Sequence, residues 1–272
     1  MKKLHICAAS HKGQLRNDNE DAFIIGNCIE REGMVSLSCP YDTELFKQNG
    51  IFLAVADGMG GHQHGALASW KTLQIISTLA GTLSQEVLSH PVVAERISKT
   101  ILDAHQHLIQ FGESHNPPSN LGTTVIGLYL RSDEVIAFQV GDSRLYRVRD
   151  KYLNLLTRDH CLSAGAPAFQ AGETEQAPVR SSVLTNSIGG GSGVRCTPEL
   201  STDLIFHPGD LFLLCSDGLS DMVQQMQLEE IMVKPLGIED KAKELIEAAN
   251  LAGGNDNITV LLVTLTEESS EQ

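Results

Sequence analysis

Four aspartates in this chain stand at the ends of apolar runs that have the length of buried strands. Asp57 follows IFLAVA, Asp217 follows LFLLCS, Asp142 follows VIAFQV and one glycine, and Asp256 stands just before ITVLLVTL. One Asp-Gly pair is ordinary turn chemistry and carries no information. Carboxylates about 5 Å apart, however, repel by roughly 3 kcal/mol per pair at an effective dielectric near 20. A bound cation removes that cost, so four acidic strand ends favour a metal site.

A further acidic cluster lies near the N-terminus, where residues 16–21 read RNDNED. Taken alone, this segment is typical of a solvated loop or hairpin. It precedes a strand-like run, however, and it joins the guanidinium of Arg16 to several carboxylates within six positions. Together with DGMGGH at 57–62, it favours a functional loop.

Composition narrows the class of protein. The 272 residues are 42% hydrophobic but only 5% aromatic, which predicts one domain over residues 1–272 with a mainly aliphatic core. The net charge of −14 argues against nucleic acid as a partner and fits cationic metals or basic protein surfaces. None of the six cysteines forms a Cys-x-x-Cys pair, which indicates reduced thiols in a cytosol.

The first residues, MKKLHICAAS, are basic, but their apolar stretch is short and is interrupted by His5. They predict a first strand rather than a signal peptide. Because no apolar run approaches the roughly 20 residues that span a bilayer, we expect a soluble protein that does not bind membranes. We also expect a cytoplasmic location and a monomer.

Periodicity and turn residues predict strands and helices in alternating groups, which indicates two packed sheets with helices outside. We expect an irregular insertion at 27–50, an antiparallel meander over 123–157, and a flap at 161–188 that is rich in Ala, Gly and Pro. The other predicted elements are strands at 4–10, 21–26, 51–56, 211–215 and 258–266, and helices at 63–81, 91–111, 227–234 and 239–252.

Seven motifs occur in order along nearly the whole chain, which thereby resembles the metal-dependent serine/threonine phosphatases of the protein phosphatase 2C family. They are RNDNED at 16–21, DGMGGH at 57–62, LGTT at 121–124, GDSRLY at 141–146, LTRDH at 156–160, CSDGLSD at 215–221 and GGNDNITV at 253–260. The resemblance implies an α+β fold, a four-layer αββα sandwich. Two antiparallel β-sheets would be flanked by helix pairs, with a two-metal site at one end.

The resemblance also assigns metal ligands, all of them oxygen donors of the kind that suits magnesium or manganese rather than zinc. They are Asp57 as the bridge between two ions, Glu20 and the carbonyl of Gly58 for one ion, Asp217 and Asp256 for the other, and Asp142 with Asp217 for a third, weaker ion. Two such ions can share a water, lower its pKa, and hold the resulting hydroxide in line with a phosphorus atom.

Two further residues match catalytic positions of the family. Arg16 matches the residue that grips the phosphate, and His62 matches the general acid that protonates the leaving seryl or threonyl oxygen. The resemblance implies phosphoserine and phosphothreonine proteins as substrates, and a cognate serine/threonine kinase or its targets as partners.

The chain departs from the family pattern in two places. Asn186-Ser187-Ile188-Gly189 stands where relatives often have Arg-Ala-Leu-Gly, which leaves the docking of the flap and the choice of substrate open. The 27–50 insertion is longer than a tight hairpin needs and is a candidate contact for a partner.

Two other classes of protein remain as alternatives. A cysteine-dependent phosphatase would use His160-Cys161, but Pro167 stands where that chemistry requires an arginine. A degenerate phosphatase that only binds phosphoproteins would have lost metal ligands, and this chain retains all of the matched ones. A metal-dependent enzyme is therefore the favoured interpretation.

Overall fold

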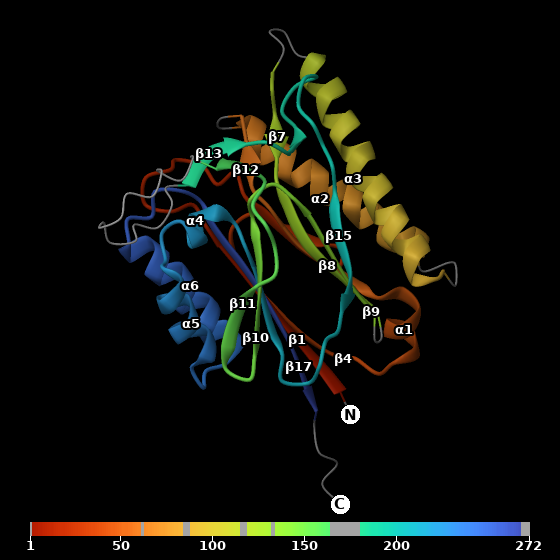
Figure 1. Cartoon of the computed structure of the whole chain (residues 1–272), viewed down its shortest axis with the longest axis vertical. Coiled ribbons are helices and arrows are strands. Elements are labelled where there is room, and N and C mark those ends of the chain that lie inside the picture. Colours follow the sequence, from red (N-terminus) through yellow and green to blue (C-terminus); the bar gives the residue numbers. More distant parts are fainter. Residues whose placement is uncertain are drawn as a thin grey trace, which may run out of the picture.

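Two six-stranded antiparallel sheets pack face to face, and helices cover both outer faces (Figure 1). The structure is a computed structural model that describes residues 2–60, 63–83, 88–114, 119–131, 134–163 and 180–267. The layers confirm the predicted αββα sandwich.

We call the two sheets the β17 sheet and the β8 sheet. The β17 sheet has the order β11 (Tyr152–Leu155), β10 (Arg144–Arg149), β16 (Leu211–Cys215), β17 (Ile258–Glu267), β1 (Lys2–His11) and β4 (Gly33–Pro40). The β8 sheet has the order β15 (Glu199–Leu204), β9 (Glu134–Val140), β8 (Val125–Arg131), β5 (Ile51–Ala56), β2 (Ala22–Ile25) and β3 (Cys28–Glu30).

Smaller elements complete the described chain. Three short strands form a separate sheet in the order β14 (Ile188–Gly189), β7 (Gly122–Thr123) and β6 (Gly58–Met59), and β12 (Cys161–Ser163) pairs with β13 (Arg180–Leu184). The helices are α1 (Glu44–Asn49), α2 (Gln63–Leu83), α3 (His90–Glu113), α4 (Asp217–Ser220), α5 (Gln225–Val233) and α6 (Ile238–Leu251).

The core strands are apolar on both faces because each sheet is covered on both sides. In β17, Leu261 and Val263 pack between the two sheets, whereas Val260 and Leu262 pack under α5 and α6. Successive side chains of a strand point to opposite faces, so burial of both faces produces a continuous apolar run. Each buried aliphatic side chain contributes about 1.5–3 kcal/mol. This double burial explains why IFLAVA and LFLLCS were recognisable as strands.

The predicted helix at 63–81 is α2, and the helix at 91–111 is α3; both cover the β8 sheet (Figure 1). The remaining predicted helices correspond to α5 and α6 beside the β17 sheet. Among the described residues, no helix combines the length and the apolarity that crossing a membrane requires.

The prediction of an irregular insertion at 27–50 is wrong, because this segment contains β3, β4 and α1. Strand β4 pairs with β1 from Gly33↔Ser10 to Pro40↔Lys3 and so extends the β17 sheet. Thr43 caps α1, where its hydroxyl accepts a hydrogen bond from the amide of Phe46 at 3.2 Å. The insertion therefore links the edges of the two sheets.

The predicted meander over 123–157 is also wrong in its topology. Its strands form two hairpins, but β8 and β9 belong to one sheet whereas β10 and β11 belong to the other. The chain changes sheets at Gly141-Asp142-Ser143, where Gly141 has a φ of +107°. That change of sheet brings Asp142 to the end of the sandwich where the other predicted ligands lie.

Candidate active site

A cavity of about 300 Å³ opens where loops from both sheets meet, and it gathers most of the predicted site residues. Seven of the eight predicted residues line it: Arg16, Glu20, Asp57, Gly58, Asp142, Asp217 and Asp256. The eighth, His62, lies outside the described residues. Residues from 16 to 256 thus meet at one place, as the motifs predicted.

Asp57 is held by its backbone between β5 and β7. Its amide donates to the hydroxyl of Thr124 at 3.1 Å, and its carbonyl accepts from the Thr124 amide at 2.9 Å and the Thr123 hydroxyl at 2.8 Å. The next residue, Gly58, pairs with Thr123 in the small sheet. These bonds fix the start of the Asp57 side chain and the direction of the Gly58 carbonyl.

Glu20 is held by the first turns of α2 and by the turn before β17. Its amide donates to Asn257 Oδ1 at 2.7 Å, and its carbonyl accepts from the Ser69 hydroxyl at 2.6 Å. A Cβ on Gly65 would stand 1.9 Å from Glu20 Oε2 and 2.9 Å from the backbone carbonyl carbon of Gly58, so glycine lets the helix lie close to the metal loop. The start of α2 therefore shapes the site, as expected for a helix that begins at the metal loop.

Asn257 braces the N-terminal loop rather than only its neighbour Asp256. Its side-chain amide donates to the carbonyls of Lys12 at 2.9 Å and Asp18 at 3.0 Å. Its backbone amide donates to Asp256 Oδ1 at 2.8 Å. The Asn257 side chain thus joins the loop that carries Arg16 and Glu20 to the loop that carries Asp256.

Asp21 is a site residue that the motif comparison left without a role. It is 1% exposed, and its Oδ2 accepts from the hydroxyls of Ser216 at 2.8 Å and Thr259 at 2.7 Å. Its Oδ1 is buried and has no hydrogen-bond partner within the described part of the chain. The available signal was its place directly before the buried run AFII, which forces this carboxylate inward.

The buried carboxylates disfavour one another's charge. Burial, followed by repulsion from Asp217, Asp21, Asp256 and Asp142, raises the pKa of Asp57 well above its usual value. Burial also raises the pKa of Asp21 and of Asp217 to about 7 in each case. Hydrogen bonds from the hydroxyls of Thr259 and Ser216 offset only part of the rise in the pKa of Asp21. The protein alone therefore does not stabilise the ionised cluster.

The donor set fits hard divalent cations. All the side chains involved offer oxygen, the charged forms of the buried acids repel one another, and Asp21 Oδ1 is a buried acceptor that no donor reaches within the described residues. Within the described ranges, no three His, Cys, Asp or Glu side chains converge as the ligands of one ion. Asp57, Asp142, Asp217 and Asp256 nevertheless line one cavity, and water fills open coordination positions when such ions bind.

Arg16 reaches into the cavity from the N-terminal loop. Its Nη2 donates to Asp256 Oδ2 at 2.7 Å, and about half of the side chain is exposed. Burial lowers the pKa of Arg16, but the ion pair with Asp256 and the nearby charges of Glu20 and Asp57 raise it by more, so the net shift of the pKa is upward. A charged, planar donor group thus stands at the rim of an acidic cavity.

Replacement of Arg16 by lysine should lower kcat/KM for a phosphopeptide by about 10- to 100-fold. Loss of a charge-assisted hydrogen bond costs about 1.5–3 kcal/mol, and an ammonium group cannot reproduce the planar fork. Steady-state kinetics at saturating manganese measures the effect, with Lys12→Arg as a charge-matched control in the same loop. Equal kinetics for the wild type and Arg16→Lys would remove Arg16 from phosphate binding.

The predicted flap at 161–188 is described only at its two ends. β12 and β13 form a short antiparallel pair in which Cys161 lies opposite Leu184, and Leu184 lines the cavity. Residues 164–179, Pro167 among them, lie outside the described residues.

His160 accepts hydrogen bonds at Nδ1 from the Gly141 amide at 3.0 Å and the Asn186 side chain at 2.9 Å. The His160 side chain therefore joins the loop of Gly141 to the segment of Asn186.

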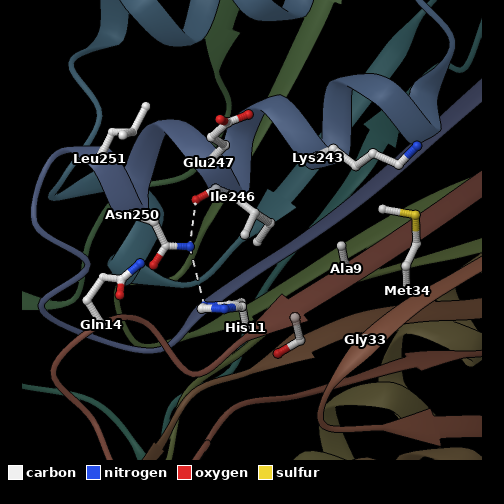
Figure 2. A pocket seen from close by; sticks show the side chains of 11 residues that line it. Ala9, His11, Gln14, Gly33, Met34, Lys243, Ile246, Glu247, Asn250 and Leu251 are labelled. Carbon is white, nitrogen blue, oxygen red and sulfur yellow. Dashed lines mark hydrogen bonds between the residues drawn. The ribbon is translucent and has the colours of Figure 1, made fainter.

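A second hollow, of about 520 Å³, lies between α6 and the strands β1 and β4 (Figure 2). Ile246, Met34 and Leu251 give it an apolar lining, while Lys243 and Glu247 bring opposite charges to its rim. None of the predicted site residues lines it. The acidic cavity is therefore the better candidate for the reaction.

Comparison with known proteins agrees with this geometry. Residues 42–252 match the family described as Protein phosphatase 2C. The chain is 31% identical over 261 residues to the serine/threonine phosphatase stp of Listeria monocytogenes, covering 96% of this chain and 95% of that protein. The comparison therefore spans nearly the whole of both chains.

Solved structures show the same fold. The serine/threonine phosphatase of S. agalactiae superposes with a TM-score of 0.75 at 25% identity and covers 97% of this chain and 100% of that one. The catalytic domain of PstP, in complex with 2 manganese ions, has a TM-score of 0.71 at 23% identity and covers 98% and 100%. This chain belongs to the protein phosphatase 2C family of metal-dependent serine/threonine protein phosphatases.

Proposed function

We propose that the acidic cavity is the catalytic centre at which this phosphatase hydrolyses phosphoserine and phosphothreonine in proteins. The observation that carries the proposal is the convergence of Asp57, Asp217 and Asp256 on one cavity, where burial and mutual repulsion raise the pKa values of Asp57 and Asp217. Such a cluster needs cations, and divalent metal dependence belongs to the family.

We propose that this site binds two ions, the number named for the manganese complex of PstP. Asp57 would contact both, Glu20 and the Gly58 carbonyl would hold one, and Asp217 with Asp256 would hold the other. When bound, paired divalent ions lower the pKa of water and offset the charge that develops on a phosphoryl group. Asp142 supports a third, weaker site with Asp217, since repulsion between these two carboxylates helps to raise the pKa of Asp217.

The remaining roles fall to Arg16 and His62. Arg16 would bind the phosphate oxygens and orient them toward the cavity. His62, directly before the start of α2, would donate a proton to the seryl or threonyl oxygen as the bond to phosphorus breaks. Without that proton, the departing alkoxide is a poor leaving group.

The wider setting is also proposed. One catalytic domain over residues 1–272 is supported by relatives that align along 96% of the chain. Six free cysteines support a reducing, cytoplasmic location. We further propose a monomer that opposes a cognate serine/threonine kinase on shared phosphoprotein substrates, since every phosphosite requires a kinase that creates it.

The proposal is tested with two substrates and two proteins. Wild type with manganese should hydrolyse both an aryl phosphate and a phosphothreonine peptide, and EDTA should abolish both activities. His62→Ala should slow the peptide by about 100-fold or more but the aryl phosphate far less, because an aryl oxide leaves without a proton. Wild-type protein that binds the phosphopeptide without EDTA-sensitive turnover would support a binding module instead; equal losses in His62→Ala would remove the acid role.

A further inference from the structure

The segment at the return end of the flap, residues 186–189, is buried against α3 and the small sheet. Asn186, Ser187 and Ile188 are 8%, 3% and 0% exposed. The chain reaches this segment from β13 and passes beside α3 (Figure 1). This segment includes the departure from Arg-Ala-Leu-Gly, so its contacts answer how the flap is docked.

His105 of α3 holds this segment through its imidazole ring. The side chain is 6% exposed, and its Nδ1 accepts a hydrogen bond from the Gly189 amide at 3.0 Å. An accepting Nδ1 requires a neutral ring with its proton on Nε2. Burial lowers the pKa of His105, which favours that neutral form, while a hydrogen bond to the Ser187 backbone partly offsets the shift.

Gly189 allows the backbone to lie directly against α3. It has a φ of +74°, and a Cβ on it would stand 2.4 Å from the Leu121 carbonyl oxygen and 3.0 Å from Leu108 Cβ. A side chain there would push the strand away from the helix. The hydrogen bond from Gly189 to His105 therefore depends on a close approach for which this position is specifically built.

Backbone pairing connects His105 to the catalytic loop. Gly189 and Ile188 of β14 pair with Gly122 and Thr123 of β7, and Thr123 in turn pairs with Gly58 of β6. The Thr123 hydroxyl also donates to the Asp57 carbonyl at 2.8 Å. One strand, β7, thus separates the segment that His105 holds from the backbone of Asp57 and Gly58.

Asn186 ties the same segment to a second loop of the site. Its Nδ2 donates to His160 Nδ1 at 2.9 Å and to the Thr197 carbonyl at 2.8 Å, and its Oδ1 accepts from the Thr197 amide at 2.8 Å. His160 Nδ1 also accepts from the amide of Gly141, the residue before Asp142, at 3.0 Å. The flap end is therefore fixed to the loop that carries Asp142.

We propose that His105 and Asn186 are positioning residues for phosphate hydrolysis. Together they fix the return end of the flap against β7 and His160, and thereby hold the loops of Asp57, Gly58 and Asp142 in register. This inference rests on the proposed catalytic centre. Neither side chain lines the cavity, so both act through the backbone segments that they hold.

Three substitutions and one control test the roles of His105 and Asn186. His105→Asn keeps an acceptor, because its Oδ1 can receive the Gly189 amide, whereas His105→Leu keeps apolar volume without an acceptor. Asn186→Asp keeps the acceptor toward Thr197 but loses both donors. His107→Ala removes an exposed histidine from the same helix and is the matched control.

We expect His105→Leu and Asn186→Asp to lower kcat for an aryl phosphate by about 10- to 100-fold, as small misplacements of catalytic groups do. The manganese concentration for half-maximal activity should rise in the same variants. His105→Asn should stay within about threefold of wild type, since it restores the hydrogen bond. Hydrogen–deuterium exchange of a peptide covering 183–191 should be faster in His105→Leu than in His105→Asn. Each protein is assayed well below its own Tm.

Several outcomes would overturn the inference. One is a folded His105→Leu protein with wild-type kinetics, and another is an equal loss in His105→Asn and His105→Leu. A leucine variant that fails to fold, beside an asparagine variant of wild-type activity, would assign His105 to the fold alone. If wild type and His107→Ala both lack manganese-dependent activity, the proposed catalytic centre fails. If both are active and one of the outcomes above is found, only the inference about His105 and Asn186 fails.

Discussion

Asp57→Asn protein should lose at least about 1,000-fold of its manganese-dependent activity while it keeps its fold. Binding of divalent ions contributes several kcal/mol to stabilisation of the transition state, and each 1.4 kcal/mol is a factor of ten in rate. The substitution removes the one charge proposed to contact both ions but preserves the shape of the side chain. Activity at saturating manganese measures the loss.

The same substitution, although it removes activity, should stabilise the metal-free protein. Without metal, Asp57→Asn should have a higher Tm than the wild type, because the buried carboxylate most strongly repelled by its neighbours has been neutralised. Manganese should raise the Tm of the wild type but barely that of the variant. Asp103→Asn, at an exposed ion pair with Lys99 on α3, is the control and should match the wild type throughout. Wild-type turnover by Asp57→Asn would contradict the two-metal mechanism.

The metal-free protein should become less stable as pH rises from about 4 toward about 7. Asp21 and Asp217 have pKa values raised to about 7 from 3.8, mainly by burial. Across that window the native state binds more protons than the unfolded state, so each group lowers the free energy of unfolding by up to about 1.4 kcal/mol per pH unit. The stabilisation is complete below the unfolded pKa and is lost as pH passes the folded one.

Manganese should reverse this trend, because it binds the ionised carboxylates. The Tm increase that manganese causes should therefore be larger at about pH 8 than at about pH 5, because these values lie above and below the raised pKa values of Asp21 and Asp217. Thermal unfolding in EDTA and in manganese across this range measures both effects. Asp217→Asn should flatten the slope in EDTA. A metal-free protein that gains stability between about pH 5 and about pH 7 would contradict the raised pKa values of the cluster.

Sequence was most informative where burial is complete. IFLAVA and LFLLCS are β5 and β16 because both of their faces are covered, and such runs cannot be mistaken for loops. The acidic residues at their ends were recognisable for the same reason. The end of a buried strand is well defined in the sequence, so the position of the residue that follows it is well defined too.

The elements that were missed lack this signal. Strand β4 reads GMVSLSCP, in which residues 35–39 alternate apolar and polar, but this short run is mostly exposed. Its pairing with β1 is a long-range contact that the local pattern does not reveal. The two-residue strands β6, β7 and β14 are too short for any periodicity. Hairpin patterns likewise do not reveal to which sheet a hairpin belongs, which is why β8–β9 and β10–β11 were joined into one meander.

The same difference between local and long-range signals holds for the site residues. Those with a motif, such as Asp57 and Asp256, line the cavity, and their catalytic roles stay a prediction. Asp21 and His105 were not assigned roles, because these depend on partners distant in sequence: Ser216 and Thr259 for Asp21, and Gly189 for His105. Such pairings arise from the tertiary fold and leave no local pattern.

Anomalous scattering from crystals soaked in manganese tests the central claim most directly. The account predicts two strong peaks in the acidic cavity about 3.5–4 Å apart, with the Asp57 carboxylate between them. Glu20 should contact one ion, and Asp217 with Asp256 should contact the other. Manganese bound elsewhere, or a cavity that stays without peaks while its carboxylates remain apart, would contradict it.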